Sequence, residues 1–561
     1  MVMGITFPLE ESESSGMKHS SARRARLLGS AAILAAGALA LTGCGGSNGS
    51  AKGASNKPLT IGTTDSITSL DPAGSYDNGS FAVQTQAFAF LFDTPYGSPD
   101  VKPDLAQSGE FTDPNTFEVK LKPGLKFANG HDLTASDVKF TFDRQQAIGK
   151  SGADSGNGPS SLLANLESTT VKDDATVDFH LKAPNDQTFE QVLSSPVGPI
   201  VDEQVFSPDK LTPDADIVKA NAFEGQYTIN SYKVNELIQY KANPDYQGIL
   251  PAAKTKTVIV KYYKDASNLK LDVQSGNIDA AYRSLAAQDV DALSKDSKVT
   301  VTSGPGGEIR YIAFNFKTQP FGTGQPDADA GKALAVRQAV ADLVDRQALS
   351  DLYKGTYSPL YSSVPDGLTG ANTSFKGLYG DGSGAPSKDK AAETLKAAGI
   401  TSPVQLNITY NSDHYGPQSG DEYGLIKDQL ESSGLFKVTL AGVENVQFSK
   451  DAPNDGYPVF QRGWFPDYSD ADNYLTPFFL QGGFLHNHYD NPQVDSLIAK
   501  ELGQTDATAR AATIGQIQDL TAKDVDIVPL LQGKQVIVTG KDVKGAVLDA
   551  SFKFRYATLS K

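Results

Sequence analysis

The single cysteine of this chain, Cys44, most constrains how the polypeptide can be held together. With no second cysteine there is no intrachain disulfide, so folded domains must be stabilised by buried apolar cores. Cys44 also ends a recognisable segment. Basic residues between positions 18 and 26 precede an apolar run, residues 27–40, and Leu41-Thr42-Gly43-Cys44 follows. A basic region, a short apolar region and a small-residue site, in that order, are typical of a secretory signal peptide.

The end of this segment resembles a bacterial lipobox, in which the chain is cut before the cysteine and the cysteine is acylated. We therefore predict that residues 1–43 are a signal peptide and that Cys44 is a lipid attachment site. The alternatives are an incidental cysteine or a transmembrane helix. The apolar run of 14 residues is shorter than the roughly 20 needed to span a bilayer. Met17 is the expected start, because the residues before it are acidic whereas signal peptides begin with basic residues.

The charge of the remaining chain excludes several classes of partner. The whole sequence carries a net charge of −16, and residues 1–43 contribute four basic and three acidic groups. Such an acidic chain is unsuited to nucleic acid or to an anionic lipid surface. Residues 44–57 are rich in Gly and Ser and are predicted to be a flexible linker. We expect an extracytoplasmic protein that is lipid-anchored to the outer face of the cell membrane.

The patterns after residue 58 alternate between strand and helix, which predicts an α/β or mixed α+β multidomain fold. Thr134 stands at a helix N-cap position with Asp137 three residues on, and residues 227–240 read as a hairpin that turns near Asn235. Further helices are predicted at residues 83–92, 332–352, 388–398, 420–433, 492–502 and 507–525. Further strands are predicted at residues 117–121, 177–181, 257–262, 309–316, 404–410, 438–443, 457–462 and 535–538.

Residues 121–144, LKPGLKFANGHDLTASDVKFTFDR, make the chain recognisable. They resemble the signature of the family 5 solute-binding proteins, the peptide- and nickel-type receptors of ABC importers. One departure is Ala128-Asn129-Gly130, where the family usually has His or Ser before Asp-Gly. Further matches follow in the family's order at residues 69–72, 225–227, 243–246, 271–279, 311–316, 336–346, 463–475 and 489–492.

The resemblance implies a two-lobed flytrap like that of periplasmic binding proteins, with an extra inserted domain. The implied segments are 58–91, 222–308 and 530–561 for domain I, 92–221 for domain II and 309–529 for domain III. A chain that crosses between lobes more than once creates a hinge, and a ligand that touches both lobes favours the closed state. The implied partners are a peptide or other small solute and an ABC permease with its ATPase. We expect a monomer without a cofactor.

The candidate ligand site lies in residues 462–472, RGWFPDYSDAD, which contain the only tryptophan. The resemblance to peptide-binding members implies that Asp467 pairs with the ligand's α-ammonium, with Trp464 and Tyr468 as aromatic surface. The alternative is a core tryptophan and an aspartate that caps a loop. Arg462 is a candidate for a ligand carboxylate, although pairing with Asp467 or a surface position explains it better.

Tyr76 and Asp77 precede the first long helix and are candidates to face the ligand, as that segment does in relatives. A helix N-cap explains Asp77 equally well. His486 and His488 raise the hypothesis of a metal site, and Asp467, Asp470 and Asp472 that of calcium. No third ligand accompanies the histidines, and the aspartates lack the glycine and glutamate of an EF-hand loop, so no metal is expected.

No catalytic motif stands out, so we predict a receptor for short peptides rather than an enzyme. Three alternatives stay open at this stage. The same fold could bind an oligosaccharide, an opine or a nickel complex. The chain could be a secreted hydrolase, because carboxylates are abundant, or a sensor lipoprotein that presents peptides to a partner.

Overall fold

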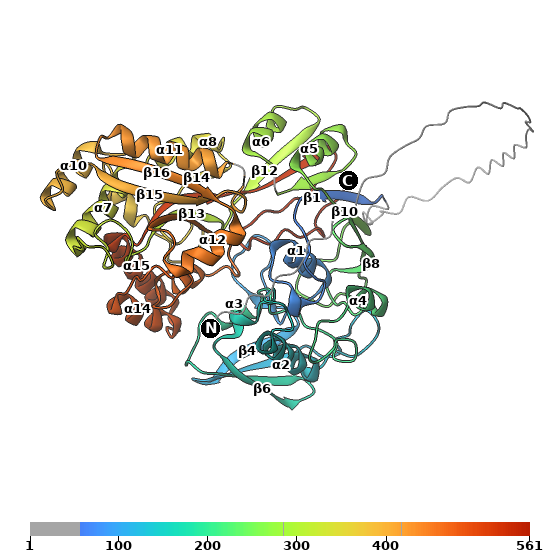
Figure 1. Cartoon of the computed structure of the whole chain (residues 1–561). Coiled ribbons are helices and arrows are strands. Elements are labelled where there is room, and N and C mark those ends of the chain that lie inside the picture. The colour runs from blue at the N-terminus through green and yellow to red at the C-terminus, as the bar shows by residue number, and fades with distance from the viewer. Residues whose placement is uncertain (1–56, 284, 417) are drawn as a thin grey trace, which may run out of the picture. The chain divides into compact units, whose positions relative to one another are not determined.

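The computed structural model describes residues 57–283, 285–416 and 418–561. The predicted signal peptide, Cys44 and all but the last residue of the linker lie outside the described residues. Within the described ranges, no helix combines the length and the apolar character that crossing a membrane requires. The chain forms a seven-, a six- and a four-stranded sheet with helices on their faces, and a two-stranded ribbon of β2 (Phe92–Asp93) and β3 (Lys102–Pro103) (Figure 1).

The seven-stranded sheet has the order β12-β19-β11-β1-β10-β9-β8. Its strands are β1 (Leu59–Thr63), β8 (Tyr227–Lys233), β9 (Leu237–Ala242), β10 (Thr257–Tyr262), β11 (Ala280–Tyr282), β12 (Val299–Gly304) and β19 (Gln535–Gly540). The central strand β1 runs parallel to β10 and β11, and both of its faces are covered. Leu59 and Ile61 belong to a core that includes Val83, whereas a Cβ at Gly62 would lie 2.5 Å from Leu269 on the opposite face.

The four-stranded sheet is antiparallel, in the order β4-β5-β7-β6, and packs against one long helix. Its strands are β4 (Ala106–Asp113), β5 (Thr116–Leu121), β6 (Leu166–Asp173) and β7 (Thr176–Leu181), and the helix is α2 (Ala135–Ser151). The predicted N-cap is confirmed, because Thr134 and Asp137 form a capping box at the start of α2. Further along α2, Arg144 donates to both carboxylate oxygens of Asp71, at 2.9 and 2.6 Å. Two of the quoted family motifs therefore meet in one buried ion pair.

The six-stranded sheet has the order β14-β18-β13-β17-β15-β16. Its strands are β13 (Ile309–Phe314), β14 (Tyr357–Pro359), β15 (Val404–Asn411), β16 (Phe436–Val443), β17 (Val459–Trp464) and β18 (Ile527–Gly533). One hydrophobic core includes Val336, Leu395 and Ile426, and a second includes Phe478 and Ile498. Helices therefore cover both faces of this sheet.

The remaining helices connect and cover these sheets. They are α1 (Asn78–Ala87), α3 (Phe189–Val192), α4 (Asp214–Ala220), α5 (Ala266–Ser275), α6 (Ala287–Ser294), α7 (Ala330–Leu343), α8 (Arg346–Leu352), α9 (Ser374–Leu378), α10 (Lys388–Ala397), α11 (Ser419–Ser432), α12 (Asn445–Asp451), α13 (Thr476–Phe479), α14 (Pro492–Leu502) and α15 (Ala507–Asp524). Short 3-10 turns include η1 (Pro72–Gly74), η2 (Ser160–Leu163), η3 (Ala452–Asn454) and η4 (Ala471–Tyr474).

Most of the predicted elements are confirmed, including the hairpin, whose turn residue Asn235 has φ 50°. Two predictions are wrong in extent. The helix predicted over residues 83–92 is α1, which ends at Ala87 because Phe88 is extended. The helix predicted over residues 332–352 is two helices, because Val344 is extended and the Asp345 side chain caps α8.

The chain crosses between the seven- and six-stranded sheets at two neighbouring places. Residues 305–308 join β12 to β13, and Lys534 alone joins β18 to β19. The two crossings touch, because the Gly533 amide donates to the Glu308 carbonyl at 2.8 Å. A Cβ at Gly306 would lie 2.3 Å from the Gly533 carbonyl oxygen, so only glycine fits at this close approach.

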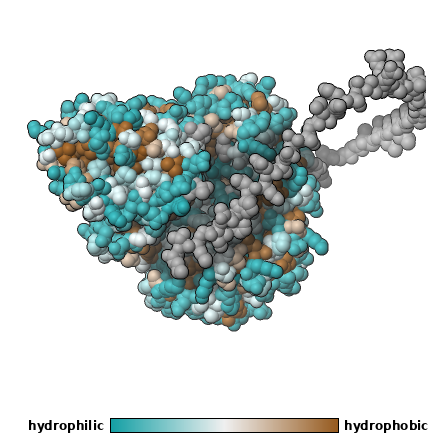
Figure 2. Space-filling model, viewed as in Figure 1, coloured by the Kyte–Doolittle hydropathy of each residue, from teal (hydrophilic) through white to brown (hydrophobic). Residues whose placement is uncertain are grey.

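The surface is mainly polar. Figure 2 shows a hydrophilic face on which apolar residues occur in small separate spots. Among the described residues, large exposed apolar side chains are scattered along the chain, as Val171, Val234, Leu271 and Leu378 illustrate. Such scattered residues are normal on a protein that faces solvent.

Candidate ligand-binding site

A cavity of about 440 Å³ opens where the two crossings meet. The seven-stranded sheet contributes Tyr282 and Arg283 at the end of β11, together with α6. The six-stranded sheet contributes the start of β13 and the loop after β17, residues 465–469. Ser194, near the four-stranded sheet, also lines it. A cavity walled by groups from separate parts of the fold is suited to a ligand that holds those parts together.

Asp467 lies in this cavity, in the loop that follows β17. The Tyr76 hydroxyl donates to Asp467 Oδ1 at 2.5 Å, and Asn473 Nδ2 donates to Oδ2 at 3.3 Å. Tyr76 precedes α1, so this bond joins segments that are 391 residues apart in sequence. Burial raises the pKa of Asp467 to about 6, against the lowering effect of these two hydrogen bonds. The ionised carboxylate has no cationic partner among the described residues.

Tyr468 also lines the cavity, and its ring packs against the core of the four-stranded sheet. Burial strongly raises the pKa of this phenol, which is therefore neutral and a possible hydrogen-bond donor. Tyr76 is 40% exposed, and its pKa is raised by partial burial and by the Asp467 carboxylate. The structure brings these two predicted residues to Asp467.

Four predicted site residues do not line the cavity, and of these only Tyr76 hydrogen-bonds to Asp467; the others are Trp464, Arg462 and Asp77. Trp464 donates from Nε1 to Asn473 Oδ1 at 2.8 Å and packs edge-on against Phe478. Arg462 is 6% exposed and makes no ion pair with Asp467, so neither the surface nor the pairing explanation describes it. Its guanidinium instead lies over the rings of Phe448, Phe460 and Phe484.

Asp77 is a helix cap rather than a lining residue. Its side chain accepts from the Ser80 amide at 2.8 Å at the start of α1. The next residue, Asn78, lines the cavity. Asp77 is therefore the N-cap of α1, as the alternative explanation proposed.

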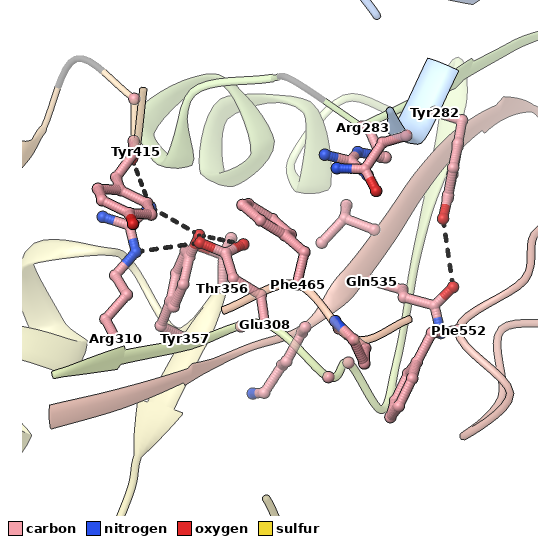
Figure 3. Close-up of a pocket in the computed structure, with 18 of the residues that line it drawn as sticks. Tyr282, Arg283, Glu308, Arg310, Thr356, Tyr357, Tyr415, Phe465, Gln535 and Phe552 are labelled. Carbon is pink, nitrogen blue, oxygen red and sulfur yellow. Dashed lines mark hydrogen bonds and ion pairs between the residues drawn. The ribbon is translucent and has the colours of Figure 1, made fainter. Parts of the chain in front are cut away.

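A buried guanidinium that sequence reasoning missed forms part of the wall. Arg310 Nη1 donates to Glu422 Oε2 at 3.0 Å, Nε to Glu308 Oε1 at 3.2 Å, and Nη2 to the Tyr357 hydroxyl at 2.9 Å. The Tyr357 hydroxyl in turn donates to the Glu308 carboxylate at 2.8 Å (Figure 3). Because Arg310 is fully engaged, this network fixes Glu308 beside one of the two crossings.

Arg283 and Phe465 are the other residues that sequence reasoning missed. In the view of Figure 3, Phe465 lies between the Glu308–Tyr357 pair and Arg283. The Arg283 guanidinium carbon is 5.6 Å from the Phe465 ring centroid. Arg283 has φ 62°, a left-handed conformation that a sequence pattern does not reveal for arginine. His414 packs edge-on near the same ring, and burial lowers its pKa, which favours the neutral imidazole.

The described residues contain no cluster of three or more His, Cys, Asp or Glu that could hold a metal. His486 and His488 are exposed and have left-handed backbones, and His488 Nε2 contacts Asp455 at 2.6 Å. Asp470 accepts two bonds of 2.8 Å from Arg510, and Asp472 accepts the Thr476 hydroxyl. Two of the three aspartates of the calcium hypothesis are therefore engaged in structural contacts.

Two sheets joined by adjacent crossings, with a cavity at the junction, define a bilobed ligand-binding protein. Comparison with known proteins gives the family. The chain belongs to the bacterial extracellular solute-binding proteins, family 5, whose middle-region profile matches residues 100–485.

The relatives align with this chain over almost its whole length. A probable D,D-dipeptide-binding periplasmic protein of Escherichia coli (strain K12) is 25% identical over 520 residues, covering 90% of this chain and 94% of its own. The glutathione-binding protein of Salmonella typhi is 26% identical over 518 residues, with the same coverage. The ABC transporter-associated periplasmic binding protein of Helicobacter pylori, solved with the peptide STSA, has a TM-score of 0.71 at 20% identity. It covers 91% of this chain and 98% of its own, and this likeness confirms the two-lobed α/β fold.

Proposed function

We propose that this protein is an extracytoplasmic receptor that binds short peptides in its cavity and delivers them to an ABC permease and ATPase complex. The observation that carries the proposal is Asp467, a half-buried carboxylate that lines the cavity and lacks a cationic partner among the described residues. An α-ammonium would supply that partner. A charge-assisted hydrogen bond in a site of low dielectric constant is stronger than one in water.

The rest of the wall suits a peptide. Phe465 and Tyr468 offer aromatic surface to backbone and side chains. The relatives bear names that describe binding of a D,D-dipeptide and of glutathione, and one solved neighbour holds a peptide. We propose that Asp467, Tyr468 and Tyr76 contact the peptide, and that the segments predicted from sequence form domains I to III.

The proposed anchor keeps the receptor near its permease. A single acyl chain binds a membrane only marginally, so we propose dual acylation at Cys44. A Cys44→Ala protein should move from the membrane fraction to the soluble fraction. Its retention in the membrane would contradict the anchor without affecting the peptide site.

Calorimetry with a short peptide such as Ala-Ala-Ala tests the site. Asp467→Asn should weaken binding at least tenfold at pH 7.5, because an ammonium bound to a charged acceptor loses about 1.5–3 kcal/mol when the charge is removed. Asp428→Asn is the matched control, since Asp428 is exposed on α11. Unchanged affinity in Asp467→Asn would remove this residue from the site.

The same samples separate a receptor from a hydrolase. A receptor returns the peptide intact, so mass spectrometry after incubation should find only the starting mass. Oligosaccharide binding in place of peptide binding would overturn the peptide assignment while leaving the fold and family unchanged.

A further inference from the structure

Arg462, outside the cavity, is a buried cation that the described part of the chain leaves without a partner. It lies in β17 and is only 6% exposed. Its Nε is buried and has no hydrogen-bond partner, and no ion pair joins it to a described residue. Arg337 and Arg346 are buried in the same lobe, but there Nε donates to the Asp524 carbonyl at 3.1 Å and to the Pro529 carbonyl at 2.7 Å.

Three phenylalanine rings surround the Arg462 guanidinium. Its Cζ is 5.1 Å from the ring centroid of Phe448, 5.6 Å from that of Phe460 and 4.9 Å from that of Phe484. Aromatic faces stabilise a cation, but they accept only weak hydrogen bonds. Burying a charge and its donors without an acceptor is unfavourable. The cage therefore favours a negatively charged acceptor at the edge of the guanidinium, where the N–H bonds point.

A second unpaired donor lies beside the first. Tyr311 is directly opposite Arg462 in the antiparallel pair of β13 and β17, so both side chains are on the same face of the sheet. The Tyr311 hydroxyl is buried and has no hydrogen-bond partner. Burial raises the pKa of Tyr311 strongly, although the Arg462 charge opposes that rise. This phenol is therefore neutral and can donate a hydrogen bond.

The nearby carboxyl group of Asp526 does not supply the missing charge. Both of its oxygens are buried without a hydrogen-bond partner. Burial raises the pKa of this carboxyl well above its usual range, so Asp526 is neutral at pH 7. The acceptor that suits Arg462 and Tyr311 therefore has to come from solution.

The cage reaches the protein surface through Phe484, which is 41% exposed. Arg462 and the three rings are absent from the wall of the ligand cavity, so the two places are separate. We propose that Arg462 Nε and the Tyr311 hydroxyl bind a small monovalent inorganic anion, such as chloride, beneath the Phe484 ring. One anion neutralises one guanidinium, and the close rings exclude larger organic anions.

The only tryptophan of the chain reports on this place directly. The Trp464 ring centroid is 5.2 Å from that of Phe484, the ring that covers the guanidinium. Trp464 Nε1 and the Asp467 amide both donate to Asn473 Oδ1, at 2.8 and 3.0 Å. The proposed anion is therefore one aromatic ring away from the loop that carries Asp467.

Thermal unfolding in sodium chloride and in sodium gluconate, at equal ionic strength, tests the proposal. Chloride should raise the melting temperature by about 1–2 °C for each tenfold increase in concentration above its dissociation constant, and gluconate should not. Arg462→Met keeps the length of the side chain but removes the donors, so it should abolish the difference. Tyr311→Phe removes only the hydroxyl and should weaken chloride about ten- to a hundredfold. Lys437→Met, which removes an exposed positive charge, is the control and should behave like wild type.

Bromide locates the ion. It is a heavy-atom quencher, so bromide bound in the cage should quench the Trp464 emission saturably in the wild-type protein. In Arg462→Met only the linear collisional quenching should remain. Crystals soaked in bromide should show an anomalous peak within hydrogen-bond distance of Arg462 Nε and the Tyr311 hydroxyl.

Three outcomes would overturn the proposal. Equal melting temperatures in chloride and gluconate, with only a water molecule at Arg462 Nε, would show that hydration satisfies these donors. A chloride effect that survives in both Arg462→Met and Tyr311→Phe would belong to another part of the protein. Loss of the effect in Lys437→Met as well would identify a general response to net charge. None of these results bears on the peptide site, which calorimetry with Asp467→Asn tests separately.

Discussion

The affinity for peptides should fall as the pH is lowered from 7.5 to 5, because Asp467 must be ionised to pair with an ammonium. Burial raises the pKa of Asp467 to about 6 in the unliganded protein. A bound cation stabilises the carboxylate, so the pKa falls in the complex. Below pH 6, binding therefore has to expel a proton, and this weakens the apparent affinity.

The size of the effect follows from that pKa. A group with a pKa of about 6 is about 97% ionised at pH 7.5 and about 9% ionised at pH 5. The dissociation constant should therefore rise about tenfold over this interval, or about 1.4 kcal/mol. Calorimetry at pH 5, 6, 7 and 7.5, in buffers of different ionisation enthalpy, measures both the affinity and the protons released.

Two variants separate the effect of Asp467 from that of other groups that titrate in the same pH range. Asp104 and Asp472 also have pKa values raised by burial to about 6, and Asp467→Asn retains them. The variant should bind weakly with no pH dependence. Tyr76→Phe removes a hydrogen bond that lowers the pKa of Asp467. In this variant the change in peptide affinity should therefore have its midpoint at a higher pH. A flat wild-type profile, or an equally steep profile in Asp467→Asn, would refute the reasoning.

The same carboxylate should reduce the stability of the unliganded protein. The pKa of Asp467 is higher in the folded protein than in the unfolded chain, where it is near 4. The folded state binds more protons between about pH 4 and 6, so stability decreases as the pH rises through that window. Above pH 6 the free energy of unfolding is lower by the full amount, at most about 3 kcal/mol. Asp467→Asn should therefore keep or raise the melting temperature at pH 7.5 while it weakens binding.

Four further substitutions test stability, measured as the free energy of unfolding in urea. Asp71→Asn should cost about 3–5 kcal/mol, because it leaves the buried Arg144 uncompensated; a loss below about 1 kcal/mol would contradict this. Gly79→Ala should cost about 1–3 kcal/mol or more, since its Cβ would lie 1.9 Å from a backbone oxygen. Gly424→Ala, with open space around it, should stabilise helix α11 by up to about 1 kcal/mol, and the opposite order of the two glycine variants would refute the steric argument. Thr134→Ala should cost about 1 kcal/mol through loss of the capping box, and no change would contradict that role.

Local signals in the sequence account for most of the secondary structure. Capping side chains, glycines with positive φ and alternating apolar residues act over a few positions, so their effects can be read without the fold. The errors arise where tertiary contacts override the pattern. Phe88 is apolar enough for a helix, yet it is extended and packs between Phe206 and Phe223. The break before α8 depends on Asp345, whose capping role competes with a continuous apolar stripe.

The site was harder to predict because adjacent residues point in opposite directions. Side chains alternate between the faces of a strand, so in Trp464-Phe465 only one ring can face the cavity. The sequence favours the tryptophan, but the structure places Trp464 against Asn473 and Phe478 and Phe465 in the wall. Arg283 was beyond prediction for another reason. Its position depends on a left-handed turn between β11 and α6 and on the distant β17 loop that supplies its aromatic neighbour.

The adjacent crossings explain how binding in the cavity would serve delivery. Rotation of one sheet against the other needs backbone changes only in residues 305–308 and at Lys534, both of which lie at the cavity. Shifting a two-state equilibrium from 1:99 to 99:1 requires about 5.5 kcal/mol of differential binding. A charge-assisted bond to Asp467 supplies about 1.5–3 kcal/mol of this, so contacts with the side of the cavity that the seven-stranded sheet forms have to supply the rest. A peptide that lacks a free ammonium would leave the closed state only partly populated, so the permease would receive few such complexes.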